Sequence, residues 1–138
     1  MIADAKEKQA TIIISSQSPN NPYELVFYLL PPLHSSENSS RNSQTIINSP
    51  PRFVGYAKNV ATAAGVPYVD HFAATISYYT KLGKETVEGY FPFEHTHTNE
   101  AGANAVAWSF LSGLRCSAAK GALQNYVNAK GQGAGARC

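Results

Sequence analysis

The chain has 138 residues, of which 43% are hydrophobic and 14% are charged, and its formal net charge at pH 7 is +2. This length and composition predict one modest domain. The lysines and arginines are scattered and form no patch for nucleic acid, and the longest apolar run, residues 25–30, is too short to cross a bilayer.

A polar helical fragment at the N-terminus is followed by an apolar run. The fragment, IADAKEKQA, has no apolar segment typical of signal peptides, so we expect no secretion signal in it. Residues 11–15 (TIIIS) are rich in β-branched side chains and predict a parallel strand buried on both faces. The loop after it, SSQSPNNPYE, would lie at the carboxyl end of that strand, where α/β proteins contact ligands. Asn20 and Asn21 are therefore candidate substrate-binding residues, although turn formation alone would also explain them.

Residues 25–48 differ in composition from the rest of the chain. They begin with LVFYLLPPLH and continue into a Ser/Asn-rich stretch, SSENSSRNSQTIIN. Because an unstructured segment of more than about 15 residues is uncommon inside a compact domain, we interpret residues 25–48 as a disordered insertion whose apolar half finds no proper core. Asn38 begins an Asn-Ser-Ser glycosylation sequon, which matters only in a secreted protein.

Regular structure is expected again from Ser49. Ser49 as N-cap and the two prolines after it predict the start of a helix that ends at Gly65. The expected apolar face of this helix comprises Phe53, Ala57, Val60, Ala61 and Ala64. A second short strand is expected at residues 66–69, followed by a helix that ends at Gly83 and buries Phe72, Ile76, Tyr79 and Leu82. This alternation predicts an α/β unit with two parallel strands and flanking helices.

The stretch of residues 90–107, YFPFEHTHTNEAGANAVA, combines polar side chains with a helix start. Asn99 is a favourable N-cap, and Glu100 suits the positive end of the helix dipole. Glu94 and His97 stand just before this helix, at a spacing that lets a carboxylate reach and orient the imidazole of a catalytic base. Taken alone, the pair is better explained by a hydrogen bond at the helix entrance than by catalysis. The helix itself should bury Val106, Ala107, Phe110, Leu111 and Leu114.

A zinc site is the alternative use of these side chains. Glu94, His95 and His97, with His71, supply suitable ligand types. No HExxH or paired-cysteine spacing supports such a site, and imidazoles two residues apart diverge in a helix. We therefore expect no metal and no cofactor. We interpret His95 as a packing or substrate-side neighbour and His71 as a structural hydrogen-bonding residue.

Four blocks carry a family resemblance: SSQSPNNPYE, NSPPRFVGYA, AAGVPYVDHF and YFPFEHTHTNEAGA. In this order they resemble the C-terminal half of fungal rhamnogalacturonan acetylesterases, which are SGNH (GDSL-type) hydrolases, and they cover nearly the whole chain outside residues 25–48. The resemblance implies a partial flavodoxin-like SGNH fold, in which this chain supplies the last two parallel strands. It also implies a secreted serine esterase, located outside the cell, that deacetylates the rhamnogalacturonan backbone of pectin. Acetylated pectic polysaccharide would be the partner of the complete enzyme.

The resemblance also implies roles for individual residues. The family's D-x-x-H motif falls on Glu94-His95-Thr96-His97, so His97 would be the catalytic base and Glu94 its orienting carboxylate. Glu stands here in place of the family's Asp; because it is one methylene longer, either the carboxylate folds back or the imidazole shifts. The family's C-terminal bridge, with the even pair of cysteines, implies a disulfide between Cys116 and Cys138.

Other parts of the family's catalytic apparatus are missing from this sequence. It contains neither the Gly-Asp-Ser block of the nucleophile nor the blocks that supply the oxyanion-hole Gly and Asn. We therefore expect no esterase activity from this chain alone. Two hypotheses remain: the C-terminal part of a polysaccharide acetylesterase, or a non-catalytic remnant or binding module. Since the family-like blocks would join almost directly without residues 25–48, we predict that these residues are translated from a retained intron.

Overall fold

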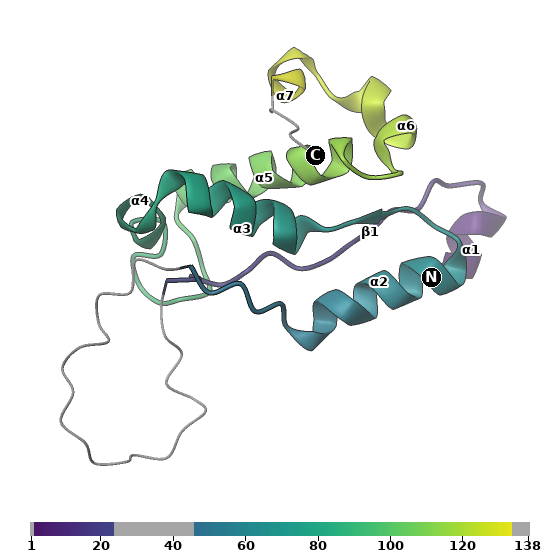
Figure 1. Cartoon of the computed structure of the whole chain (residues 1–138). Helices are drawn as coiled ribbons and strands as arrows, with labels where there is room; N and C mark the ends of the chain where they lie inside the picture. Colours follow the sequence, from purple (N-terminus) through teal and green to yellow (C-terminus); the bar gives the residue numbers. More distant parts are fainter. Residues whose placement is uncertain (1, 24–45, 134–138) are drawn as a thin grey trace.

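The computed structural model describes residues 2–23 and 46–133 (Figure 1). It is a mixed α/β arrangement with two parallel strands flanked by helices, as the sequence predicts. The Asn38 sequon, Cys138 and all but the last three residues of the 25–48 segment lie outside the described residues. In chain order the elements are α1 (Ile2–Glu7), β1 (Ile14–Ser15), α2 (Arg52–Ala64), β2 (Tyr68–Val69), α3 (His71–Leu82), α4 (Lys84–Glu88), α5 (Glu100–Arg115), α6 (Lys120–Leu123), η1 (Gln124–Tyr126) and α7 (Ala129–Gln132).

The two strands run between α2 on one side and the α3–α5 pair on the other (Figure 1). Ile14 is opposite Tyr68 and Ser15 is opposite Val69. The backbone N–H of Ser16 donates to the carbonyl of Val69 at 3.1 Å, which extends the pairing by one bond. Val69 is fully buried against α5. The strands therefore fix where α3 begins and where the last turns of α5 pack.

The first strand is shorter and less buried than the sequence predicts. β1 has two residues instead of the expected five, and the three isoleucines before Ser15 are half-buried and not covered on both faces. In the described part of the chain β1 pairs with β2 alone. Its second edge has no neighbour there that would extend the ladder or cover those side chains.

This open edge leads to a prediction for the isolated chain. An apolar strand edge is a template for pairing with another copy, and a core this small is marginal. We expect the isolated chain to self-associate and to melt without a sharp transition. Sedimentation combined with a thermal melt followed by circular dichroism measures both properties. A monomeric mass with a cooperative melt would contradict the expectation.

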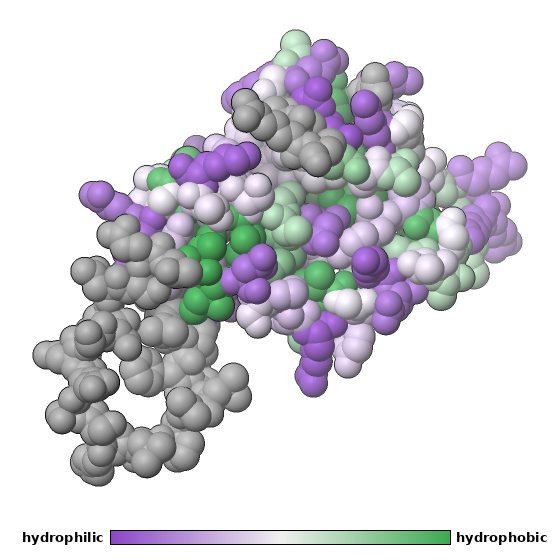
Figure 2. All heavy atoms as spheres, viewed as in Figure 1, coloured by the Kyte–Doolittle hydropathy of each residue, from purple (hydrophilic) through white to green (hydrophobic). Residues whose placement is uncertain are grey.

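Helix α2 presents a different face to the sheet from the one predicted. Val54 and Ala61 are buried, whereas Phe53 and Val60, placed in the apolar face by the sequence, are 54% and 48% exposed. The helix begins at Arg52 after Pro51, which makes no side-chain cap bond, so Ser49 is not its N-cap. Its end is as predicted, with Gly65 in the left-handed region at φ +61°. Apolar residues also reach the surface in the view of Figure 2, where they lie among hydrophilic ones.

Helices α3 and α5 follow the sequence prediction more closely. In α3 the predicted Phe72, Ile76 and Tyr79 are buried. The Asp70 carboxylate caps this helix by accepting from the backbone N–H of Ala73 at 2.9 Å. In α5 the predicted Leu114 is buried, while Ala107 is exposed and does not belong to the apolar stripe. None of the helices in the described part has both the length and the apolar character required to span a membrane.

The last residues of the predicted insertion belong to the packed structure. Ile46 packs against the core clusters around Tyr79 and Phe72. The backbone N–H of Ile47 donates to the carbonyl of Pro22 at 2.9 Å. Ile46 therefore joins the core, and Ile47 is held by its backbone, before Ser49, where the sequence predicts that order resumes.

Candidate functional site

The loop between α4 and α5 holds the candidate site, and its base is anchored by aromatic packing. Phe91 is buried, and its ring centroid lies 6.4 Å from that of fully buried Tyr79. Tyr90 also lies near Tyr79, with the two ring centroids 6.2 Å apart. The core of α3 therefore positions the residues from which the loop departs.

Asn99 closes the loop at its base and also begins α5. Its backbone N–H donates to the carbonyl of Tyr90 at 2.8 Å, and its side-chain amide donates to the carbonyl of Gly89 at 2.9 Å. Its side-chain oxygen accepts from the backbone N–H of Gly102 at 2.9 Å, which confirms the predicted N-cap. One residue thus ties residues 91–98 to a sixteen-residue helix.

Gly102 permits the close contact between this helix and the loop. A Cβ atom at Gly102 would lie 2.7 Å from the Cβ atoms of both Thr98 and Tyr90. Only a residue without a side chain fits there without displacing the loop. The first turn of α5 and the polar loop are therefore held together by a contact that no larger residue can make.

Glu94 and His97 are in direct contact. The Nδ1 atom of His97 lies 2.7 Å from Oε1 of Glu94. The same carboxylate also accepts from two backbone N–H groups, that of His97 on Oε1 and that of Thr96 on Oε2, the latter at 2.9 Å. The longer Glu side chain thus folds back over its own turn. With Nδ1 donating to the carboxylate, Nε2 is left as the basic nitrogen of the imidazole.

These donors control the ionisation of Glu94. The backbone N–H of His97, aided by that of Thr96 and by the imidazole, lowers the pKa of Glu94 from 4.5 to about 2. Glu94 is therefore a carboxylate at every pH at which the imidazole can act as a base. A fixed negative charge beside Nδ1 orients the ring and keeps the proton of the neutral imidazole on Nδ1.

The lowered pKa of Glu94 gives a pH-dependence prediction. The folded value lies below 4.5, so the stabilising effect of this carboxylate on the turn is complete above that pH and is lost as the pH falls towards 2. Backbone amide NMR signals of Thr96 and His97 should shift together with a midpoint near 2. The Glu94→Gln variant is the control and should lack this titration. A midpoint near 4.5 in the unmodified chain would show that the turn bonds are not formed in solution.

The strand-end loop reaches the same region through its backbone. The N–H of Asn21 donates to the carbonyl of His95 at 2.7 Å, which joins the loop after β1 to the candidate site. The side-chain oxygen of Asn21 is buried and accepts from the backbone N–H of Tyr23 at 3.1 Å, as a turn residue would. Asn20 is exposed, and His95 is half-buried. Substrate contacts by Asn20, Asn21 and His95 remain predictions.

His71 has the structural role that the sequence suggested. It lies within hydrogen-bond distance, 3.0 Å, of the carbonyl of Val106 through Nε2, and its ring meets that of Phe110 edge-on at 5.4 Å. Burial lowers the pKa of His71, which favours the neutral ring with Nε2 as donor. Within residues 2–23 and 46–133, no three His, Cys, Asp or Glu side chains are grouped so that they could hold a metal ion. The predicted disulfide partner of Cys116 lies outside this part of the chain.

The sequence did not reveal how open the site is. The side chain of His97 is 87% exposed, that of Glu94 39%, and the neighbouring Phe93 is 95% exposed. Among the described residues, only Glu94 hydrogen-bonds to the imidazole of His97. One sequence signal could have indicated this openness. Phe93 follows Pro92 in a polar loop that has no apolar periodicity, so no pattern assigns its large aromatic side chain to a buried face. The basic side of the imidazole is thus accessible to another group.

Comparison with characterised proteins adds one relative. No family model matches the chain. A rhamnogalacturonan acetylesterase from Emericella nidulans is 44% identical to it over 111 residues, which are 80% of this chain and 38% of that protein. The chain therefore spans well under half the length of this relative.

Proposed function

From this homology to part of a fungal rhamnogalacturonan acetylesterase, we propose that the chain is the portion of a serine-type carbohydrate esterase that carries the catalytic base. The observation that supports this most strongly is the 2.7 Å contact between His97 Nδ1 and Glu94, on a loop anchored to α5. The complete enzyme would remove acetyl groups from acetylated rhamnogalacturonan outside the cell. The rest of the catalytic apparatus would come from sequence beyond this chain.

The chemistry assigns a task to each side chain. His97 Nε2 takes the proton from the serine hydroxyl as the serine oxygen attacks the acetyl carbonyl, and later returns it to the departing sugar oxygen. Ionised Glu94 keeps the second imidazole proton on Nδ1 and balances the positive charge that forms on the ring. The serine and the donors for the tetrahedral oxyanion are not in this sequence, which has no Gly-Asp-Ser.

The proposed fold is the terminal part of an SGNH hydrolase domain. Two features support it. The strands β1 and β2 are parallel and are joined through helix α2, and among the described residues no strand pairs with the second edge of β1. In a complete parallel sheet a further strand would pair with that edge. The same arrangement explains why His97 is so exposed, since the segment that bears the serine would lie over it.

The alternative is a non-catalytic remnant or binding module. The absence of the nucleophile block is the observation that favours it. Under this alternative Glu94 and His97 would only stabilise the entrance of α5. The two functions differ in what the gene encodes upstream of this chain.

Sequencing the transcript distinguishes them. The proposed function requires an in-frame upstream segment with an apolar strand followed by Gly-Asp-Ser. The same reads test the origin of residues 25–48, which should be missing from the spliced message if they come from a retained intron. A mature message without Gly-Asp-Ser upstream would overturn the catalytic proposal, and one that encodes HSSENSSRNSQ would overturn the intron prediction.

A further inference from the structure

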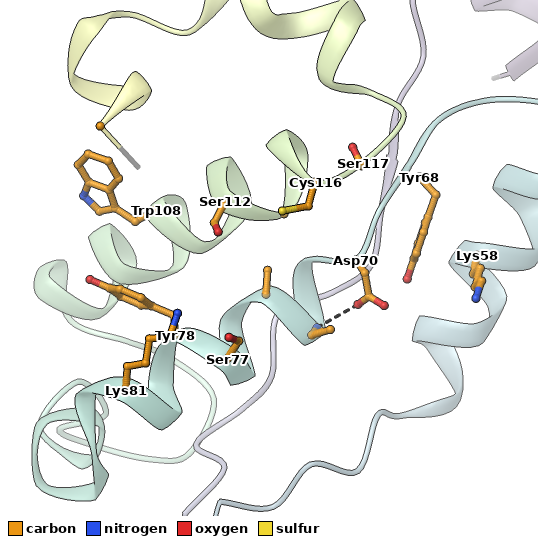
Figure 3. A pocket seen from close by; sticks show the side chains of 14 residues that line it. Lys58, Tyr68, Asp70, Ser77, Tyr78, Lys81, Trp108, Ser112, Cys116 and Ser117 are labelled. Atoms are coloured by element: carbon orange, nitrogen blue, oxygen red, sulfur yellow. Dashed lines mark hydrogen bonds between the residues drawn. The ribbon is translucent and has the colours of Figure 1, made fainter. Parts of the chain in front are cut away.

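A hollow outside the Glu94–His97 loop lies where α3 and α5 meet. Its volume is about 670 Å³, and residues of α2, β2, α3 and α5 line it (Figure 3). Neither Glu94 nor His97 is among the lining residues, so this groove is separate from the candidate catalytic pair. Figure 3 shows Trp108 and Tyr78 at one end of the groove and Asp70, Tyr68 and Lys58 towards the other.

Small residues form the floor of the groove. A Cβ atom at Gly113 would lie 3.1 Å from the Cβ atom of Ala74 and 3.3 Å from Cγ1 of Val69, so α5 approaches α3 and β2 closely at this point. Ala73 and Ser77 of α3 also line the hollow. The groove is thus a depression between two packed helices, with larger side chains rising at its ends.

The end formed by Trp108 and Tyr78 combines aromatic rings with a positive charge. Both side chains are half-buried, and Lys81 follows Tyr78 by three residues on α3, so the two share one helix face. Lys81 is exposed and forms no ion pair with a carboxylate of the described residues. The acidic group of the groove, Asp70, lies at the other end and caps α3 through Ala73. It therefore does not neutralise Lys81.

We propose that this groove binds an acidic oligosaccharide, with a sugar ring against Trp108 and Tyr78 and a uronate carboxylate paired with Lys81. Aromatic side chains that are half-buried offer an apolar face together with a polar edge, which suits the C–H face of a sugar ring. An unpaired ammonium favours a carboxylate over a neutral sugar. The hydroxyl of exposed Ser77 supplies a further polar contact in the same groove.

The choice of a galacturonate polymer rests on the proposed function, since rhamnogalacturonan contains galacturonate. The groove would add a second contact with the polymer, apart from the base. It would hold the chain on pectin without taking part in the reaction. Binding can therefore be measured on unacetylated oligogalacturonate, with no nucleophile present, so a failed binding test and a failed activity test are distinguishable.

The test uses the full 138-residue chain, diluted until sedimentation shows a monomer, and its own tryptophan as the reporter. Trp108 is the single tryptophan, so its fluorescence reports on the groove alone. Titration with an oligogalacturonate should change this fluorescence saturably, whereas an uncharged galactose oligomer should not. Lys81→Glu should weaken binding by at least about tenfold, because an attraction becomes a repulsion. The matched control, Lys8→Glu, reverses the charge of an exposed lysine outside the groove and should change it by less than about twofold.

Three results would overturn the proposal. The first is a folded chain whose fluorescence does not change up to about 10 mM oligogalacturonate, so that any Kd would lie above that concentration. The second is equal weakening by Lys81→Glu and Lys8→Glu, which would show only a general effect of charge. The third is equal binding of oligogalacturonate and the uncharged galactose oligomer, which would show that the groove does not select a uronate.

Discussion

Replacement of His97 by Ala should lower acetate release by several orders of magnitude in an enzyme completed with the missing half. The hybrid for this measurement joins the N-terminal part of the Emericella nidulans relative to this chain with residues 25–45 removed, which keeps the packed residue Ile46 and the backbone bond of Ile47. The substitution removes the imidazole that the ionised Glu94 carboxylate orients, and loss of a triad base typically lowers the rate by several orders of magnitude. Initial rates on acetylated rhamnogalacturonan give the ratio directly.

The neighbouring residues provide matched controls for the His97 prediction. His95→Ala removes an imidazole two residues away that is half-buried and contributes its backbone carbonyl to Asn21, and it should cost much less. Glu94→Asp should keep or raise the rate, since the shorter carboxylate need not fold back as far to meet Nδ1. A folded hybrid that remains active without His97 but fails without His95 would assign the base to the other imidazole.

Gly102→Ala should have the second large effect, on both stability and rate. The added methyl group would lie 2.7 Å from Thr98 and Tyr90, so the loop or the helix must move. Overpacking of this kind typically costs about 1–3 kcal/mol in the free energy of unfolding. A displacement of about 1 Å in the loop can lower the rate by roughly 100-fold. Denaturant unfolding and acetate release of the hybrid measure the two effects.

Gly55→Ala is the matched control for this glycine prediction. Gly55 also lies inside a helix, α2, but a Cβ atom there would have no neighbour within 4 Å. The change should stabilise the hybrid by about 0.5–1 kcal/mol, because alanine loses less backbone entropy than glycine in a helix. Equal losses from Gly102→Ala and Gly55→Ala would show that the close contact at α5 does not exist.

Features that depend on the local sequence could be predicted. Asn99 caps α5, and Gly65 and Gly83 end α2 and α3, because caps and left-handed termini depend on a few neighbouring residues. The parallel pairing of two strands follows from the alternation of strand and helix. The contact between Glu94 and His97 is likewise local, because the two residues are three positions apart on one turn.

Features that depend on distant segments could not be predicted. Which face of α2 is buried depends on how the helix packs on β1 and β2. For this reason Val54 is buried, whereas the sequence predicted that Phe53 would be. Packing of Ile46 depends on Tyr79 and Phe72, far along the chain. The groove between α3 and α5 has no sequence signal, since Trp108 and Tyr78 line the same groove only after those helices pack. The exposure of His97 also depends on which distant segments lie over it, and not on its neighbours in sequence.

The central claim is that Glu94 and His97 are one half of an esterase site. Acetate release from acetylated rhamnogalacturonan tests it most directly when three samples are compared at neutral pH: this chain, the N-terminal part of the relative, and the hybrid of the two. We expect turnover by the hybrid and none above the uncatalysed rate by either part. A folded hybrid without activity, or equal activity in the isolated chain, would contradict the claim.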